Sequence, residues 1–143
     1  MFTMAERTLI IIKPDAMEKK LAGEVLSRFE KRGLKIVAAR LLLFDKNLCD
    51  EHYSHLKGKP FFPSLVSFMT SSPVLCAVLE GENAVQVVRE MCGPTDSQKA
   101  SKGTIRGDYG TDVQANTIHA SDSKETAETE VGRFFKPDEL FQY

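Results

Sequence analysis

The chain has 143 residues, of which 42% are hydrophobic and 27% are charged. This length and composition are typical of one compact globular domain and exclude an intrinsically disordered chain. The formal net charge of -1 excludes an overall positive field of the kind that holds nucleic acid, so any anion site must be local.

The first third of the chain has the pattern of a strand, a helix and a second strand. Residues 8–12 are mostly β-branched and predict a buried strand, which ends before Pro14 because proline cannot continue a central strand. Apolar residues recur at i, i+4 over residues 21–29 and predict a helix that stops at Gly33, a typical left-handed helix end. The β pattern then returns over residues 34–44 and predicts the second strand.

The middle of the chain predicts a helical hairpin, a third strand and another helix. Residues 49–57 and 61–70 have the pattern of two short helices separated by a Gly-Lys-Pro turn. Residues 73–80 form an apolar run that predicts a buried strand. The next helix covers residues 83–91, and we expect Asn83 to cap its start.

The last third begins with a long polar segment, residues 94–110, and loops of this length are usually functional. Residues 117–120 predict a brief last strand. A helix over residues 122–135 follows, and Asp122 with Glu125 resembles a capping box at its start.

The order of these elements predicts an α+β fold of the ferredoxin-like, or split β-α-β, plan. We expect an antiparallel four-stranded sheet with helices packed on it and the helical hairpin as an insertion. No linker interrupts the pattern, so residues 1–143 are expected to form a single domain.

Neither a secretory leader nor a membrane span is expected from the sequence. No apolar run approaches the roughly 20 residues of a membrane span, and the first seven residues lack the apolar part of a secretory leader. Three cysteines, at positions 49, 76 and 92, form no C-x-x-C pair and predict reduced, mostly buried thiols. We therefore expect a cytoplasmic protein without a membrane partner.

His119 is the strongest candidate for chemistry among single residues. It ends a short strand and is followed by small polar residues that lead into a helix. A helix N-terminus favours a nearby phosphate and helps to keep an imidazole neutral, which is its nucleophilic form. Glu130, in the same helix, could accept a hydrogen bond from the other ring nitrogen and fix the tautomer. Without further support, a histidine that merely caps the loop is the more frequent case, because most histidines are not catalytic.

Phosphate binding, if present, must be built from side chains, because neither a P-loop nor a G-x-G-x-x-G motif occurs. The candidates are Lys13 after the first strand, Arg89 in the helix over residues 83–91, and Arg106 with Thr104 in the polar segment. Each of them alone is more often a solvated surface charge than a ligand for phosphate.

The hairpin carries a second group of polar and aromatic side chains. His52 and His55 have the H-x-x-H spacing of metal ligands, but no third ligand is near in sequence, so we expect an exposed helix face. Tyr53, Phe61 and Leu65 suit either the stacking of a base or packing in the core, and the residues alone favour core packing.

The segment from Asn116 to Ser123, N-T-I-H-A-S-D-S, with Ala127 and Glu130 after it, is similar to the signature N-x-I-H-G-S-D-S-x-x-x-A-x-x-E of nucleoside diphosphate kinases. The resemblance covers nearly the whole chain. Its other segments are E-R-T-L-I-I-I-K-P-D at residues 6–15, H-Y-x-x-L-K at 52–57, K-P-F-F at 59–62 and G-T-I-R-G-D at 103–108.

The resemblance implies a nucleoside diphosphate kinase, which passes the γ-phosphoryl group of ATP to nucleoside diphosphates in a ping-pong reaction. His119 would be the phosphorylated nucleophile, Glu130 would orient its ring, and Ser121 would contact the same shell. Lys13 would act both in catalysis and in binding. The residues implied to hold the nucleotide are Lys13, Tyr53, Phe61, Leu65, Arg89, Thr95, Arg106, Val113 and Asn116. Phe61 would stack on the base, which suits an enzyme that accepts purines and pyrimidines alike.

The resemblance also implies Mg²⁺ that is carried with the nucleotide phosphates, with no protein ligand to the metal. It implies a homo-oligomer, a tetramer or a hexamer built on a common dimer.

The sequence departs from the family pattern at three places. Ala120 replaces the usual glycine, and alanine is tolerated there if the backbone φ is negative. Residues 95–102 lack the usual prolines, and the short end at Tyr143 is similar to bacterial-type members.

Two other classes of function are compatible with the fold alone. A non-catalytic ligand-binding module would not need His119 and Glu130 together. A nucleic-acid binder is disfavoured by the net charge and by the absence of stacking aromatics of the RNA-recognition type on a strand. Strong, salt-sensitive affinity for DNA would distinguish the second alternative.

Overall fold

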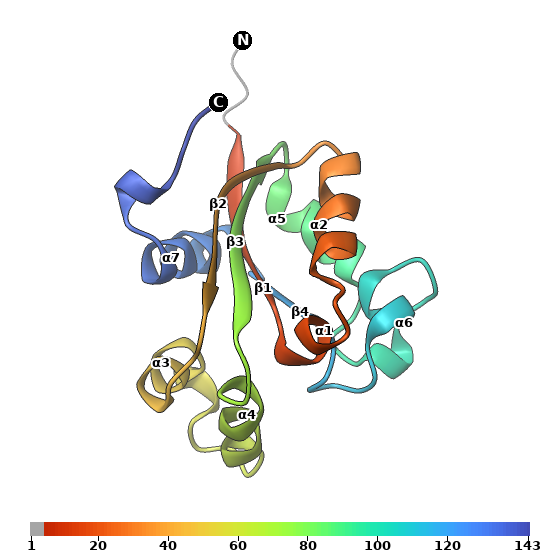
Figure 1. The fold of residues 1–143 in the computed structure, drawn as a ribbon, viewed down its shortest axis with the longest axis vertical. Coiled ribbons are helices and arrows are strands. Elements are labelled where there is room, and N and C mark those ends of the chain that lie inside the picture. Colours follow the sequence, from red (N-terminus) through yellow and green to blue (C-terminus); the bar gives the residue numbers. More distant parts are fainter. Residues whose placement is uncertain (1–4) are drawn as a thin grey trace.

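The computed structural model describes residues 5–143. Residues 1–4, part of the segment for which no secretory leader is expected, lie outside this range. Its centre is a four-stranded sheet in the order β2-β3-β1-β4, in which all neighbours are antiparallel. The strands are β1 (Glu6–Ile12), β2 (Lys35–Leu42), β3 (Val74–Gly81) and β4 (Ile118–Ala120) (Figure 1). The predicted ferredoxin-like sheet is therefore confirmed.

Within residues 5–143, seven α-helices surround this sheet. They are α1 (Pro14–Glu18), α2 (Ala22–Lys31), α3 (Lys46–His52), α4 (Phe62–Met69), α5 (Ala84–Cys92), α6 (Ile105–Tyr109) and α7 (Lys124–Phe134). Three short 3-10 turns cover Ser54–Leu56, Ser97–Lys99 and Pro137–Glu139. None of the helices in residues 5–143 has both the length and the apolar character needed to cross a membrane.

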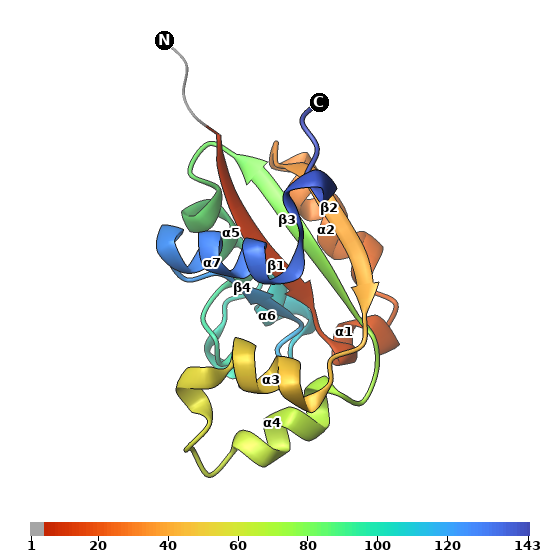
Figure 2. The same ribbon diagram turned by 90° about the vertical axis from the view of Figure 1, so that its left-hand side faces the viewer.

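The helices form a layer on each face of the sheet. In Figure 1, α7 lies to the left of the strands while α2 and α5 lie to the right, and Figure 2 shows α7 crossing in front of the strands. The alternation of side chains along β1 explains both layers. Leu9 and Ile11 point to the core under α7 and the α3–α4 hairpin, while Ile10 and Ile12 point to the core under α2 and α5. Because both faces are covered, β1 reads as a continuous apolar run.

Two helices are absent from the sequence prediction. The helix α1 begins directly after β1 with Pro14 at its first position, and α6 lies inside the segment expected to be a loop. Both have only five residues, so neither shows the repeated i, i+4 pattern by which longer helices are found. The α6 helix is capped by Thr104, whose hydroxyl accepts a hydrogen bond from the Gly107 N–H.

Two predicted helix starts differ in the structure. Asn83 precedes α5 in a left-handed conformation without a side-chain cap, and the carboxylate of Glu6 instead accepts the N–H of Val85. The cap of α7 is Ser123, whose hydroxyl accepts the Thr126 N–H, so the predicted start at Asp122 is wrong by one residue.

Other local predictions are confirmed. Gly33 has φ +95 after α2, as expected for a left-handed helix end. All three cysteines are free and buried. The single-domain organisation of residues 1–143 stays a prediction.

Candidate active site

The position of His119 follows from strand pairing. In β4 it lies opposite Ile11 of β1, and directly opposed residues of an antiparallel pair point to the same face of the sheet. His119 therefore faces the layer of α7 and the hairpin, where its side chain is 20% exposed. This places a half-buried imidazole between two elements that lie far apart in the sequence.

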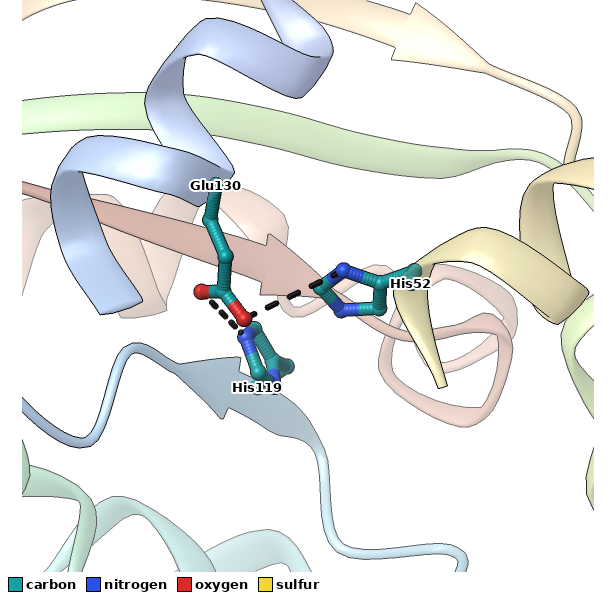
Figure 3. A group of neighbouring side chains, drawn as sticks. All are labelled: His52, His119 and Glu130. Carbon is teal, nitrogen blue, oxygen red and sulfur yellow. Dashed lines mark hydrogen bonds and ion pairs between the residues drawn. The ribbon is translucent and has the colours of Figure 1, made fainter. Parts of the chain in front are cut away.

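Glu130 of α7 contacts the imidazole ring of His119. Its Oε1 lies 2.9 Å from His119 Nε2 (Figure 3). The same oxygen accepts a 2.6 Å hydrogen bond from the Ser121 hydroxyl. Burial opposes the charge on Glu130, but the hydrogen bonds from His119 and Ser121 hold the pKa of this carboxyl below its usual value. Because an ionised carboxylate only accepts, the imidazole proton lies on Nε2 and the lone pair lies on Nδ1.

Ser121 links this pair to the sheet. Its side chain is fully buried. The hydroxyl oxygen accepts a hydrogen bond from the N–H of Leu9 at 3.3 Å, and the hydroxyl donates one to Glu130. Ala120, between Ser121 and His119, does not have a positive φ, so the expectation for this replacement of glycine is confirmed.

His52 is the largest error of the sequence prediction. It is 4% exposed rather than on an exposed face, and its ring centroid lies 4.7 Å from that of His119 in an edge-on arrangement. Burial, followed by the neighbouring His119, lowers the pKa of His52 to about 3, so the ring is neutral. His52, His119 and Glu130 place their ligand-type atoms within 4.8 Å of one another, whereas His55 is exposed. The local sequence contains no signal for this cluster.

Lys13 and Asn116 form a buried polar pair beside His119. Lys13 Nζ donates a 2.8 Å hydrogen bond to Asn116 Oδ1, and Asn116 Nδ2 donates to the carbonyls of Thr95 and Val113 at 2.9 and 3.2 Å. Lys13 is 7% exposed, and burial, followed by the nearby charge of Arg106, lowers its pKa to about 8. One amide thus joins the end of β1 to two distant loops.

Arg106 of α6 is held with its guanidinium facing into the same region. Its Nη1 and Nη2 donate to the carbonyls of Gly93 and Ile118 at 2.8 and 2.7 Å. Its buried Nε has no hydrogen-bond partner among the described residues. Burial lowers the pKa of Arg106, and the charge of Arg89 lowers it further. Arg106 thus lies near two other cations, Lys13 and Arg89. A bound anion would stabilise all three charges.

These side chains line one cleft of about 970 Å³. The cleft brings together His119 and all nine residues expected to contact a nucleotide, while Ser121 and Glu130 support His119 from behind. Phe61 is 49% exposed and Val113 60%, whereas Tyr53 and Leu65 are buried in the hairpin core. The sequence did not predict the other members of the wall, among them Gln86, Glu90, Lys99 and Gln114.

The segment that lacks the family prolines is still anchored by side chains. Asp96 accepts the Gln98 N–H at the start of the turn Ser97–Lys99, and the carbonyl of Thr95 is held by Asn116. The carbonyl of Asp112 accepts the N–H of Ser97, and its carboxylate accepts the N–H groups of Gln114 and Ala115. How strongly this loop affects nucleotide affinity stays a prediction.

Comparison with known proteins agrees with this geometry. The family model described as nucleoside diphosphate kinase matches residues 6–140. The chain is 54% identical over 141 residues to the nucleoside diphosphate kinase of Pyrococcus furiosus, which covers 96% of this chain and 88% of the relative.

Solved structures show the same fold. The nucleoside diphosphate kinase of Aquifex aeolicus has a TM-score of 0.92 at 47% identity, covering 96% of this chain and 99% of that one. The enzyme of Halobacterium salinarum in complex with CDP has a TM-score of 0.94 at 45% identity, covering 96% and 92%. The chain therefore belongs to the nucleoside diphosphate kinase family, whose members transfer phosphoryl groups between nucleoside triphosphates and diphosphates through a phosphohistidine.

Proposed function

We propose that His119 Nδ1 attacks the γ-phosphorus of a bound nucleoside triphosphate such as ATP. A bond forms between Nδ1 and phosphorus while the bond from phosphorus to the bridging oxygen breaks, and the diphosphate leaves. A second nucleoside diphosphate then attacks the same phosphorus and restores His119. The observation that carries this proposal is the 2.9 Å contact between Nε2 and Glu130, which leaves the Nδ1 lone pair beside a cationic cleft.

Glu130 supports the reaction through charge as well as position. As the phosphoryl group forms its bond with Nδ1, the imidazole becomes cationic, and the carboxylate at Nε2 stabilises that charge. Ser121 keeps the carboxylate aimed at the ring through its 2.6 Å hydrogen bond. Ser121 and Glu130 are thus proposed as positioning residues for the nucleophile His119.

The phosphates are assigned to the cationic part of the cleft. Arg89, Arg106 and Thr95, which all line the cleft, are proposed to bind them, the two arginines through their positive charge. Lys13 and Asn116 are proposed to contact the sugar hydroxyls and the phosphoryl group in transfer. Catalysis of phosphoryl transfer depends mainly on such positioning and charge neutralisation.

The base is assigned to the apolar part of the cleft, between the hairpin and the loop around Val113. The exposed ring of Phe61 is proposed to stack on the base, with Val113 covering it and Tyr53 and Leu65 supporting the wall. Stacking and apolar contact do not distinguish base edges. This arrangement would give an enzyme with broad tolerance for the base.

Mg²⁺ is proposed to arrive on the nucleotide rather than on a protein site. Within residues 5–143, the single cluster of three metal-ligand side chains is His52, His119 and Glu130, and its imidazoles are poor ligands for Mg²⁺. The cations of the cleft suit phosphate oxygens, which would hold the metal together with water. When bound, Mg²⁺ would neutralise phosphate charge alongside Lys13 and Arg106.

The low pKa of Lys13 predicts a pH dependence. Below about pH 8 Lys13 of the free enzyme is a cation, and above it the charge that attracts phosphate is lost. We expect kcat/KM for ATP to fall above pH 8 by up to about tenfold per pH unit. Lys13→Arg, which stays charged, should have a lower rate but no such fall. Parallel profiles for the two enzymes would contradict this assignment.

Labelling tests the proposed intermediate directly. Incubation with γ-labelled ATP and Mg²⁺, without an acceptor, should place acid-labile, base-stable label on His119, and added GDP should remove it as labelled GTP. Peptide mapping identifies the residue. Label on another residue, or a folded enzyme that binds nucleotide and makes GTP without any label, would exclude the proposed role of His119.

The chain is also proposed to act as a homo-oligomer, a tetramer or a hexamer built on a dimer. Support comes from β2, an edge strand of the sheet, near whose end Leu41 and Leu43 are 64% and 58% exposed.

A cytoplasmic location is proposed because the three cysteines are free, which suits a reducing compartment.

A further inference from the structure

His119 lies between two hollows rather than one. Besides the large cleft, a polar hollow of about 520 Å³ opens between α7 and the end of α3, and His52, His119 and Glu130 are in its wall. Nothing in the phosphoryl transfer described above uses this hollow or His52. It gives an ion or small molecule a path to the Nε2 side of His119, away from the nucleotide side.

The three side chains form a donor set of two imidazoles and one carboxylate. His119 Nε2 lies 2.9 Å from Glu130 Oε1, and His52 Nδ1 lies 3.9 Å from Glu130 Oε2. Their ligand atoms all lie within 4.8 Å of one another (Figure 3). Zinc binds such ligands at about 2.0–2.2 Å, so movements of about 1 Å would bring all three atoms to one ion.

His52 has a lone pair available for this purpose. Its Nδ1 accepts a 2.9 Å hydrogen bond from Arg133 Nη1, so the ring proton lies on the other nitrogen. That nitrogen, Nε2, is buried and has no hydrogen-bond partner among residues 5–143. Arg133 also lies 3.4 Å from Glu51 on the surface, so its guanidinium has a second partner when it leaves His52.

We propose that His52, His119 and Glu130 bind a transition-metal ion of the zinc type, with water as the fourth ligand, and that this ion switches the enzyme off. The donor set of two histidines and a glutamate is one that zinc accepts, and it differs from the phosphate and water oxygens that suit Mg²⁺. Arg133 competes with the metal for the same lone pair of His52 and so limits its affinity.

The effect on catalysis follows from the tautomer, and this part rests on the proposed role of His119. A metal on Nε2 displaces the proton that Glu130 now accepts. The single proton of the neutral imidazole must then lie on Nδ1, which removes the lone pair that attacks phosphorus. Zinc would therefore block formation of the phosphohistidine without occupying the nucleotide cleft.

Binding can be measured without any activity. Co²⁺ is the first probe, because a four-coordinate Co²⁺ absorbs visible light far more strongly than the hydrated ion. Titration of the nucleotide-free enzyme should produce this band, and Zn²⁺ should displace it. His52→Gln should weaken Co²⁺ binding by at least about tenfold, while His55→Gln, a change at the exposed neighbouring histidine, should not. No band, or an equal effect of both variants, would overturn the site.

Arg133→Ala provides a second test that does not remove a ligand. It frees the His52 lone pair from a charged donor, so Zn²⁺ should bind at least about tenfold more tightly and inhibit at correspondingly lower free concentration. Assays at saturating Mg²⁺ and ATP, with each variant compared to its own uninhibited rate, measure this shift. Weaker or unchanged zinc binding in Arg133→Ala would overturn the proposal, whatever the outcome of the labelling experiment.

Discussion

Replacing His119 with alanine should abolish phosphoryl transfer while the protein still folds and binds nucleotide. The substitution removes the proposed nucleophile but leaves Lys13, Arg89 and Arg106, which are proposed to hold the phosphates. Loss of a covalent nucleophile leaves only positioning, so we expect the rate to fall by at least about 10⁴-fold. A coupled assay for triphosphate formation measures this loss, and calorimetry with ADP measures the affinity.

The affinity for ADP should stay within about threefold of the wild-type value, because Nδ1 is proposed to bond to phosphorus only during transfer. His55→Gln is the matched control, since it removes an exposed histidine of the same region. Because His55 lines the cleft but has no proposed role in the transfer step, this variant should keep ping-pong turnover. A His119→Ala enzyme with appreciable ping-pong turnover would show that the nucleophile lies elsewhere.

Replacing Arg106 with alanine should damage both stability and catalysis. The buried guanidinium donates to the carbonyls of Gly93 and Ile118, and both acceptors lose a charged partner in the variant. We expect the free energy of unfolding to fall by about 3 kcal/mol, measured by urea denaturation. We also expect kcat/KM to fall by about 10²–10³-fold, because a preorganised cation for the transferring phosphate is lost.

Arg89→Ala is the matched control for this change, because Arg89 is exposed and lines the same cleft. It removes an equal charge without leaving buried carbonyls unpaired. Its free energy of unfolding should change by less than about 0.5 kcal/mol, whereas its affinity for nucleotide should fall. Equal losses of stability in both variants would contradict the anchoring role assigned to Arg106.

Most of the fold is visible in the sequence because it depends on local patterns. The apolar run of β1, the periodicity of α2 and the glycine after it are all set by neighbouring residues. The helix α1 was missed because one turn contains no period. The cap of α5 was assigned wrongly because its acceptor, Glu6, lies on another element, 79 residues before Val85.

The residues of the site also differ in whether a local pattern or a distant contact determines their position. His119 and Glu130 occur in a single motif on β4 and α7, so the sequence alone suggests their pairing. His52 carries no such signal, because its burial results from the packing of α3 against His119 and the aromatic ring of Phe134. An exposed face was the reasonable prediction for a polar helix end. His52 is buried instead because it contacts elements that are distant from it in the sequence.

The double hydrogen bond of the Asn116 amide has a consequence for engineering. Its Nδ2 holds the loop at Thr95, and Arg106 holds the same chain again at Gly93 and through its own backbone in α6. Both ends of the intervening stretch are thereby fastened to the sheet independently of what lies between them. Because Lys99 and Ser101 between these two fastenings line the cleft, a change in the length of residues 98–102 would reshape the wall of the nucleotide site while leaving its ends in place.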